Sequence, residues 1–317
     1  MTAEDLAILA RQLEAHPAIA EKATIEAAYA PASQVSQNIQ LGDDCAAIPD
    51  SNGEHLLFAA EGMLPSFVAE DPWFAGYCAV MVNLSDIAAM GGTPIAITDV
   101  LWTPDSAASS EIWDGLQAAS RAYNVPVVGG HTTYTGKPET GTHLAAAVLG
   151  RAGSQLLTSF HAQPGDHLVM AIDMKASFRK NKPFWNASTD ATPEHLQTTL
   201  ALPRKIAELG ISQACKDISN GGIVGTLAML AHCSNVGATL DLDAIPTPAS
   251  TPLLKWLSAF PSYGYLFAAK EKDIPNLQQV FRANKINTSS IGRFTDAKQL
   301  TLQSGSSREV LKFSNVT

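Results

Sequence analysis

Hydrophobic and polar positions divide the first half of the chain into alternating strands and helices. Short apolar runs bounded by turn residues indicate strands, and apolar residues spaced three and four apart indicate helices. Strands are predicted at 56–60, 95–102, 125–128 and 143–149, the third of them buried, and helices at 73–90 and 105–123. Asp105 or Ser106 is the expected N-cap of the second helix. The alternation indicates a domain that combines a sheet with helices.

The second half repeats this style after a turn signal. The run Q-P-G-D at 163–166 precedes an apolar strand at 167–172, which places a domain boundary near 151–166. Further elements are a helix near 193–208, a strand or loop into Asp217, a helix at 222–234, strands at 237–242 and 263–269, a helix at 274–283 and terminal strands. The expected organisation is a helical arm at 1–39, a first domain at 40–152 and a second domain at 153–317.

The N-terminal arm is predicted from its leucine spacing. Leu6, Leu9 and Leu13 recur at roughly helical intervals, and Pro17 divides a helical stretch that runs from 3 to 30. Residues 31–40 read as a polar connector. We expect the arm to pack on the first domain.

The helix at 73–90 carries the most informative polar residues. Its apolar face consists of Tyr77, Val80, Met81, Leu84, Ile87 and Ala88. Asn83 and Asp86 lie off that face, three residues apart, and Gly91 and Gly92 follow the helix. An acid near a helix C-terminus opposes the helix dipole, and a buried one needs a metal or a donor. Asp86 is therefore a candidate ligand, and a partly exposed acid is the alternative.

Composition narrows the classes of function. The chain has 317 residues, 46% hydrophobic and 16% charged, so it can bury a sizeable core. Its net charge of −9 argues against non-specific nucleic-acid binding. No apolar run is long enough to span a membrane and the N-terminus lacks signal-peptide features, so we expect a cytoplasmic protein without a membrane partner.

Three further acidic residues are candidates for metal binding. Asp43 and Asp44 follow Gly42, and adjacent carboxylates repel each other unless a cation or donors lie between them. Glu61 ends an apolar strand, where ligands of α/β sheets usually bind. Magnesium prefers such oxygen ligands together with substrate phosphates. A solvated turn and an ordinary strand-end charge are the alternatives.

Two glycine-rich segments could contact an anion. Gly129 and Gly130 follow an apolar strand and precede His131 and Thr132, and glycines there allow close backbone approach to a ligand. His131 could bind phosphate, transfer a proton or ligate metal, or have a purely structural role. The segment 217–222, D-I-S-N-G-G, opens a helix whose amides could attract an anion, although Ser219 or Asn220 could simply cap that helix.

The densest basic cluster lies at Lys175, Arg179, Lys180 and Lys182. It could engage an anionic substrate such as a phosphate ester or carboxylate, or it could be a solvated loop. The chain contains neither a P-loop nor a dinucleotide fingerprint, and it lacks a nucleophile elbow and the H-E-x-x-H motif.

Taken in order, these segments resemble the aminoimidazole ribonucleotide (AIR) synthase superfamily. That group includes thiamine monophosphate kinase and selenophosphate synthetase, and the similarity is greatest to its AIR synthase-related branch. The matching segments are G-D-D-C-A-A-I at 42–48, V-N-L-S-D-I-A-A-M-G-G-T-P at 82–94, V-V-G-G-H-T at 127–132, P-G-D-H-L at 164–168, D-I-S-N-G-G-I at 217–223 and S-Y-G-Y-L-F at 262–267.

The resemblance implies an α/β (α+β) fold with two AIR synthase-like domains. The first would bind ATP and Mg²⁺ and form a barrel-like homodimer through its sheet, and the second would be mixed α/β. It implies metal ligation by Asp43, Asp44 and Asp86, with Glu61 adding charge, and phosphate support by Asn83. The nucleotide turn would be formed by Gly129, Gly130 and Thr132, and the catalytic groups would be Asp43, Asp86, His131 and Asp217. The candidate substrate contacts are Lys175 and Arg179 of the basic cluster, together with Asn220.

The implied reaction is ATP- and Mg²⁺-dependent transfer of phosphate, or ATP-driven ligation or cyclisation, on a small anionic metabolite. Thiamine monophosphate kinase-like activity is an alternative, but His131 and Asn220 stand where that kinase carries aspartates. Glu61 stands where aspartate is usual, and Tyr265-Leu266 replaces an acidic pair. The third possibility is a non-catalytic nucleotide-binding assembly subunit.

Overall fold

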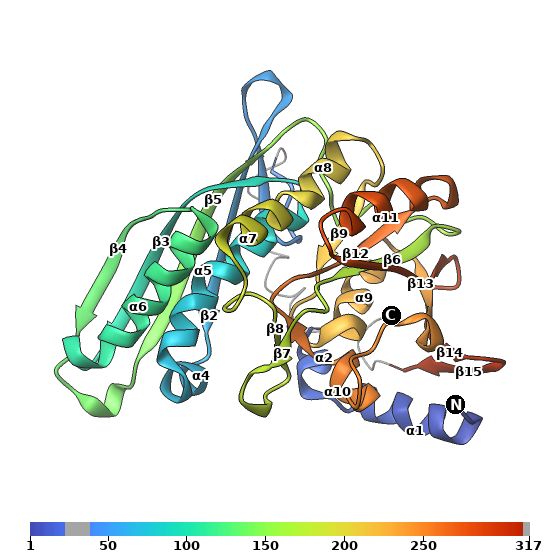
Figure 1. Ribbon diagram of the computed structural model, residues 1–317, viewed down its shortest axis with the longest axis horizontal. Helices are drawn as coiled ribbons and strands as arrows, with labels where there is room; N and C mark the ends of the chain where they lie inside the picture. Colours follow the sequence, from blue (N-terminus) through green and yellow to red (C-terminus); the bar gives the residue numbers. More distant parts are fainter. Residues whose placement is uncertain (23–38, 313–317) are drawn as a thin grey trace.

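The computed structural model describes residues 1–22 and 39–312, which form two lobes, each built on its own sheet (Figure 1). The first lobe has a sheet in the order β1-β2-β5-β3-β4, and the second has a larger sheet in the order β15-β14-β10-β13-β6-β12-β9. A small sheet, β11-β8-β7, completes the second lobe. The expected α/β fold with two domains of sheets and helices is confirmed.

The elements of the first lobe are β1 (Ala46–Pro49), β2 (His55–Met63), α4 (Pro65–Glu70), α5 (Pro72–Ala89), β3 (Thr93–Thr103), α6 (Ser106–Tyr123), β4 (Val127–Tyr134) and β5 (His143–Ala152). The strands of the second lobe are β6 (His167–Ile172), β7 (Ser177–Phe178), β8 (Phe184–Asn186), β9 (Ala214–Asp217), β10 (Gly237–Asp241), β11 (Phe260–Pro261), β12 (Gly264–Ala269), β13 (Asn287–Thr295), β14 (Leu300–Ser304) and β15 (Ser307–Leu311). The helices on that side are α1 (Ala3–Glu14), α2 (Pro17–Lys22), α7 (Pro193–Leu200), α8 (Leu202–Glu208), α9 (Gly222–Cys233), α10 (Leu253–Leu257) and α11 (Ile274–Arg282).

Helix α5 is buried on almost every side. It packs on the first sheet and on α6, and its end reaches β9 and α8 of the second lobe. Asn83 is fully buried and Asp86 is only 7% exposed. The buried surface of the helix is therefore wider than the single apolar face that was predicted, and it includes both polar residues. The helix ends where Gly91 takes a left-handed conformation, at φ +74°, which suits glycine because it has no Cβ.

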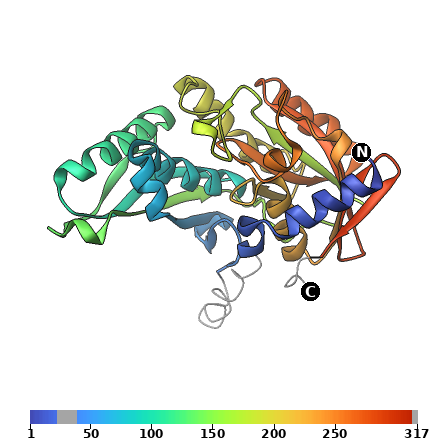
Figure 2. The same ribbon diagram turned by 90° about the horizontal axis from the view of Figure 1, so that it is seen from below.

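The N-terminal arm packs on the second lobe, so its expected placement on the first domain is wrong. Figure 2 shows α1 lying along the second lobe, and Leu6, Leu9 and Leu13 share a core with Leu168 and Phe294. This apolar stripe covers a region between α10 and the hairpin of β14 and β15. The predicted helix beyond Lys22, and the connector up to residue 38, lie outside the described residues.

Strand β4 differs from its prediction in both length and exposure. The expected buried strand at 125–128 begins at Val127 and extends to Tyr134, and Val128 is 61% exposed. Gly129 and Gly130 therefore lie inside a strand paired with β3 and do not form a turn after it. In the described part of the chain, no helix is both long and apolar enough to cross a membrane.

Helices α5 and α6 pack closely where they cross, and Gly76 of α5 allows a test of this packing. A Cβ at Gly76 would lie 2.1 Å from the carbonyl oxygen of Ile112. We expect Gly76→Ala to lower the free energy of unfolding by about 1–3 kcal/mol through overpacking, despite the higher helix propensity of alanine. Urea denaturation measures this change. Gly153→Ala, which enters open space, should stay within about 0.5 kcal/mol of the wild type, and an equally stable Gly76→Ala protein would contradict the close crossing.

Candidate functional site

Three carboxylates meet where the two lobes join. Asp44 precedes β1, Asp86 lies in the last turn of α5, and Asp217 is the last residue of β9. One carboxylate oxygen from each residue lies within 4.8 Å of the other two. We call these three residues the acid cage. The sequence singled out all three, and the structure brings them together.

Local backbone geometry places each member of the acid cage. Gly42, with φ +85°, turns the chain immediately before the acidic pair. Gly91 ends α5 shortly after Asp86 and so keeps this residue in the last turn of the helix. On the other side, pairing of Asp217 with Tyr265 of β12 sets the end of β9 at the edge of the larger sheet. Two elements of the first lobe and one strand of the second are therefore needed to build the cage.

The cage has oxygens without partners. Asp44 Oδ2 and Asp86 Oδ2 are buried and accept no hydrogen bond from the described residues. Burial of an unpaired carboxylate oxygen is costly unless a cation or donor satisfies it. Divalent cations such as Mg²⁺ take carboxylate oxygens as ligands, so the arrangement fits one.

Burial and mutual repulsion raise the pKa values of two members of the cage. Burial, followed by the negative charge of Asp217, raises the pKa of Asp86 well above its ordinary value. Burial and then the charge of Asp44 raise the pKa of Asp217 to about 7. A bound cation would reverse this effect, because it favours the ionised form of each carboxylate.

Asp43 lies beside the acid cage and contacts backbone amides, and its predicted role as a metal ligand stays a prediction. Its Oδ2 accepts a hydrogen bond of 2.6 Å from the backbone N–H of Ser159, and its Oδ1 accepts one of 2.9 Å from the N–H of Asp44. Both oxygens thus accept hydrogen bonds from backbone donors, and Asp43 is not among the three carboxylates that lie within 4.8 Å of one another. Its carboxylate joins the first lobe to the segment that enters the second.

Two lysines that sequence reasoning missed lie at the cage. Lys216, one residue before Asp217, is 4% exposed and forms an ion pair with Asp44 Oδ1, and its Nζ lies 3.9 Å from Asp43 Oδ1. Lys22 reaches in from the N-terminal arm and donates a 2.8 Å hydrogen bond to Ser219 Oγ. Burial and the charge of Lys216 lower the pKa of Lys22 to about 8. A lysine inside an otherwise apolar strand was the available signal for Lys216.

Glu61 and Asn83 lie beside the cage. Glu61 is on β2 at an exposed position, where partial burial and the charge of Asp44 raise the pKa of its carboxyl group. Asn83 lies one helical turn before Asp86 and donates through Nδ2 to Ala79 O at 2.8 Å and Ala146 O at 3.4 Å. Its Oδ1 is buried and has no partner in the described structure. The predicted phosphate contact by Asn83 stays a prediction.

The β4 residues lie away from the cage. Glu61 pairs with Ala146, which pairs with Asp99, which pairs with Gly130, so three strand spacings, roughly 14 Å, separate β2 from β4. His131 is exposed and contacts Thr133 Oγ1 at 3.0 Å. Within one copy of the chain, the structure therefore does not bring Gly129, Gly130, His131 or Thr132 to the acid cage.

Gly130 has a steric role instead. A Cβ there would lie 2.6 Å from Asp99 Oδ1, so the missing side chain makes room for this aspartate. Asp99 is 1% exposed, and both of its carboxylate oxygens lack partners among the described residues. Burial raises the pKa of Asp99. Its position inside an apolar strand gave no signal separating it from an ordinary strand residue.

The predicted substrate residues have separate surroundings. Arg179 donates to both oxygens of Asp71, at 2.8 and 3.1 Å, and lies 4.0 Å from the Phe74 ring. It is thus an interlobe contact, and its predicted substrate role stays a prediction. Asn220 is exposed at the start of α9. The side chain of Lys175 is exposed as well.

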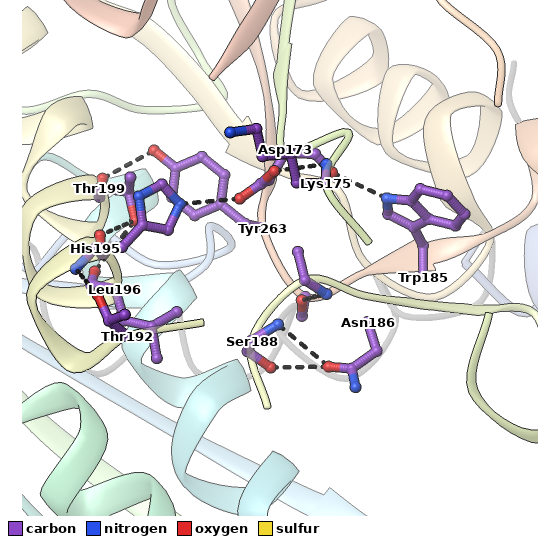
Figure 3. A network of polar contacts seen from close by, with 12 residues as sticks. Asp173, Lys175, Trp185, Asn186, Ser188, Thr192, His195, Leu196, Thr199 and Tyr263 are labelled. Carbon is purple, nitrogen blue, oxygen red and sulfur yellow. Dashed lines mark hydrogen bonds and ion pairs between the residues drawn. The ribbon is translucent and has the colours of Figure 1, made fainter. Parts of the chain in front are cut away.

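Figure 3 shows the polar network next to Lys175. Asp173 accepts the backbone N–H of Lys175 at 2.8 Å through Oδ1, and its Oδ2 lies 3.0 Å from His195 Nε2. Trp185 Nε1 donates to Asp173 O at 2.9 Å. Sequence reasoning missed this pair, because 22 residues separate Asp173 from His195.

Comparison with known proteins gives the family. The family model "AIR synthase related protein, N-terminal domain" matches residues 42–152, and the model of the C-terminal domain matches residues 160–305. Together they cover most of the chain. The protein belongs to the AIR synthase-related family.

Relatives of known sequence include proteins with and without a stated activity. An uncharacterised protein of Synechocystis is 47% identical over 86% of this chain and 83% of its own length. A thiamine-monophosphate kinase of Salmonella typhimurium is 31% identical over 68% of each chain. A selenide, water dikinase of Colwellia psychrerythraea is 25% identical over 64% of this chain and 60% of its own.

Solved structures share the fold. PurL of T. maritima, complexed with ADP, superimposes with a TM-score of 0.72 at 17% identity, over 88% of this chain and 45% of PurL. The present chain thus corresponds to about half of PurL. A ThiL structure complexed with AMPPCP and TMP gives a TM-score of 0.66 at 18% identity, over 91% of this chain and 95% of ThiL.

The raised pKa of Asp217 generates a prediction on stability. A carboxyl group with a higher pKa in the folded protein stabilises the fold below its unfolded pKa, near 3.8, and this contribution is lost as pH rises through about 7. We expect the metal-free protein to lose thermal stability as pH rises from about 4 to about 7, between these two pKa values. Calorimetry should show a smaller loss for Asp217→Asn and a smaller loss for the wild type in millimolar Mg²⁺. Identical pH profiles for all three samples would contradict the geometry of the cage.

Proposed function

We propose that this protein is an ATP- and Mg²⁺-dependent phosphotransferase, or an ATP-driven ligase, that acts on a small anionic metabolite. The observation that carries the proposal is the acid cage with its buried, unpartnered Asp44 and Asp86 oxygens. Relatives named as a kinase and a dikinase support the choice of phosphoryl chemistry. Arg179, the predicted substrate contact, is paired with Asp71.

Each residue of the site has a part in this proposal. Asp44, Asp86 and Asp217 would hold Mg²⁺, which when bound supplies positive charge to the phosphates of ATP. The ammonium of Lys22 lies at the margin of the cage, where it can contact a phosphate oxygen. Backbone amides at the N-terminus of α9, which begins at Gly222, favour negative charge beside Asp217. The contribution of the chain is therefore positioning and electrostatics.

Two other functions have specific support. Thiamine monophosphate kinase-like activity is supported by the Salmonella relative, although His131 and Asn220 depart from that pattern. The same departures favour a non-catalytic nucleotide-binding subunit. ³¹P NMR of ATP with Mg²⁺ and a metabolite panel distinguishes these outcomes: a phosphorylated product indicates a phosphotransferase, and released phosphate with a joined product indicates a ligase. Turnover abolished by Asp44→Asn would exclude the non-catalytic subunit.

Binding of ATP tests the cage directly. We expect Asp86→Asn to weaken binding of ATP in Mg²⁺ at least tenfold, or about 1.4 kcal/mol, because a metal ligand is lost. Isothermal titration calorimetry measures the affinity. Asp296→Asn removes the same charge from an exposed position and should bind like the wild type. Equal affinities for the wild type and Asp86→Asn would exclude the proposed metal site.

We also propose that the protein functions as a homodimer formed through the first sheet. Phe58, Val100, Trp102 and Leu149, on three neighbouring strands, are each 37–50% exposed on the sheet face opposite α5. A contiguous apolar face of this kind favours burial against a partner, and a second copy presents the same face under two-fold symmetry. His131, which pairs with Val100, would then lie at the interface.

A charge on this face should separate the subunits. We expect the wild type to be dimeric and Trp102→Glu to be monomeric, because a carboxylate would be buried without a partner. Size-exclusion chromatography with light scattering measures the mass. Leu209→Glu changes a 57% exposed leucine on the second lobe and should leave the dimer intact. A monomeric wild type would contradict the proposal.

A further inference from the structure

Lys216 places a positive charge within the acidic site. Its side chain is 5% exposed, and its ammonium contacts Asp44 Oδ1 with Asp43 Oδ1 3.9 Å away. Strand β9 fixes the lysine backbone, and a compact ammonium satisfies only the oxygens on the side that it faces. We call Lys216, Asp43 and Asp44 the lysine corner.

Asp44 connects this corner to the acid cage. Its Oδ1 pairs with Lys216, whereas its Oδ2 is buried without a partner in the described structure. Asp86 Oδ2 is likewise unpartnered, and a carboxylate oxygen of Asp217 completes the group within 4.8 Å. The carboxylates therefore divide into a side already neutralised by an ammonium and a side that still needs a cation.

Charge balance points in the same direction. Five carboxylates lie in or beside the site, those of Asp43, Asp44, Glu61, Asp86 and Asp217, and the two lysines offset two of the five negative charges in the fully ionised state that a bound cation favours. One divalent cation would leave a net charge of −1. A second divalent cation would make the net charge of the nucleotide-free site positive. It would also have to displace the buried ammonium of Lys216 from Asp44.

We propose that Lys216 is a built-in cation that takes the place of a second divalent metal ion at the lysine corner. The acid cage then binds one divalent cation, between Asp44 Oδ2, Asp86 and Asp217, as long as no nucleotide is present. This inference rests on the proposed function, since it assumes that the cage is a metal site. It assigns Lys216 a role in setting the number of metal ions.

Counting bound Mn²⁺ tests the inference without any turnover. Electron paramagnetic resonance of free Mn²⁺ during a titration gives the number of ions held per chain. We expect one for the wild type and two for Lys216→Met, because the neutral side chain leaves Asp43 and Asp44 without their cation. Lys272→Met removes a charge from an exposed position and should bind one. The double variant Lys216→Met, Asp43→Asn removes one charge of each sign and should also return to one.

The outcomes separate this inference from the proposed function. A wild type that binds no Mn²⁺ would overturn the metal site itself. A wild type that binds two, or a Lys216→Met protein that binds one with unchanged affinity, would overturn the role of Lys216 and leave the metal site standing. If Lys216→Met unfolds in EDTA, recovery of its fold in millimolar Mn²⁺ supports the inference. Failure of Mn²⁺ to restore it overturns the inference.

Discussion

Buried negative charge at the junction of the lobes is the constraint on which the rest of the structure depends. Asp44, Asp86 and Asp217 are removed from water with too few donors around them, and burial followed by the neighbouring negative charges raises the pKa of Asp86 and of Asp217. Such an arrangement persists only because stable packing elsewhere holds it in place. The all-round burial of α5, the glycine that ends it and the anchored end of β9 supply that packing. The packing of the fold therefore supports the unfavourable burial of these carboxylates at the site.

Local sequence signals predicted what local forces determine. The strand at 167–172 has the predicted bounds, and Asp105 caps α6 by accepting a hydrogen bond from Ala108 N, as expected. The long helix that carries Asn83 and Asp86 was also located, because its apolar spacing and terminal glycines are contained in a single segment. The residues of the acid cage could be predicted as candidates because each lies near a glycine or at the end of an element. Both features can be recognised in the sequence alone.

The failures concern contacts between distant segments. The leucines of the arm indicated a helix, but they could not say which lobe has the complementary apolar surface. Arg179 and its neighbours indicated a basic cluster, and nothing near them in sequence showed that Asp71, 108 residues away, would occupy the arginine. Lys216 was overlooked for the same reason, because its partner Asp44 is 172 residues distant. Gly130 was assigned to a nucleotide turn, since its true neighbour, Asp99, lies on another strand.

The attachment of the lobes at separate points has a consequence for motion. Near the cage, Asp43 accepts a hydrogen bond from the backbone N–H of Ser159. At a second place Arg179 forms an ion pair with Asp71. At a third, Phe184 packs edge-on against Phe74, with ring centroids 4.9 Å apart. Attachments at three separate places oppose rotation of one lobe against the other. The residues of the acid cage, which come from both lobes, are therefore held in their relative positions by contacts that lie outside the cage itself.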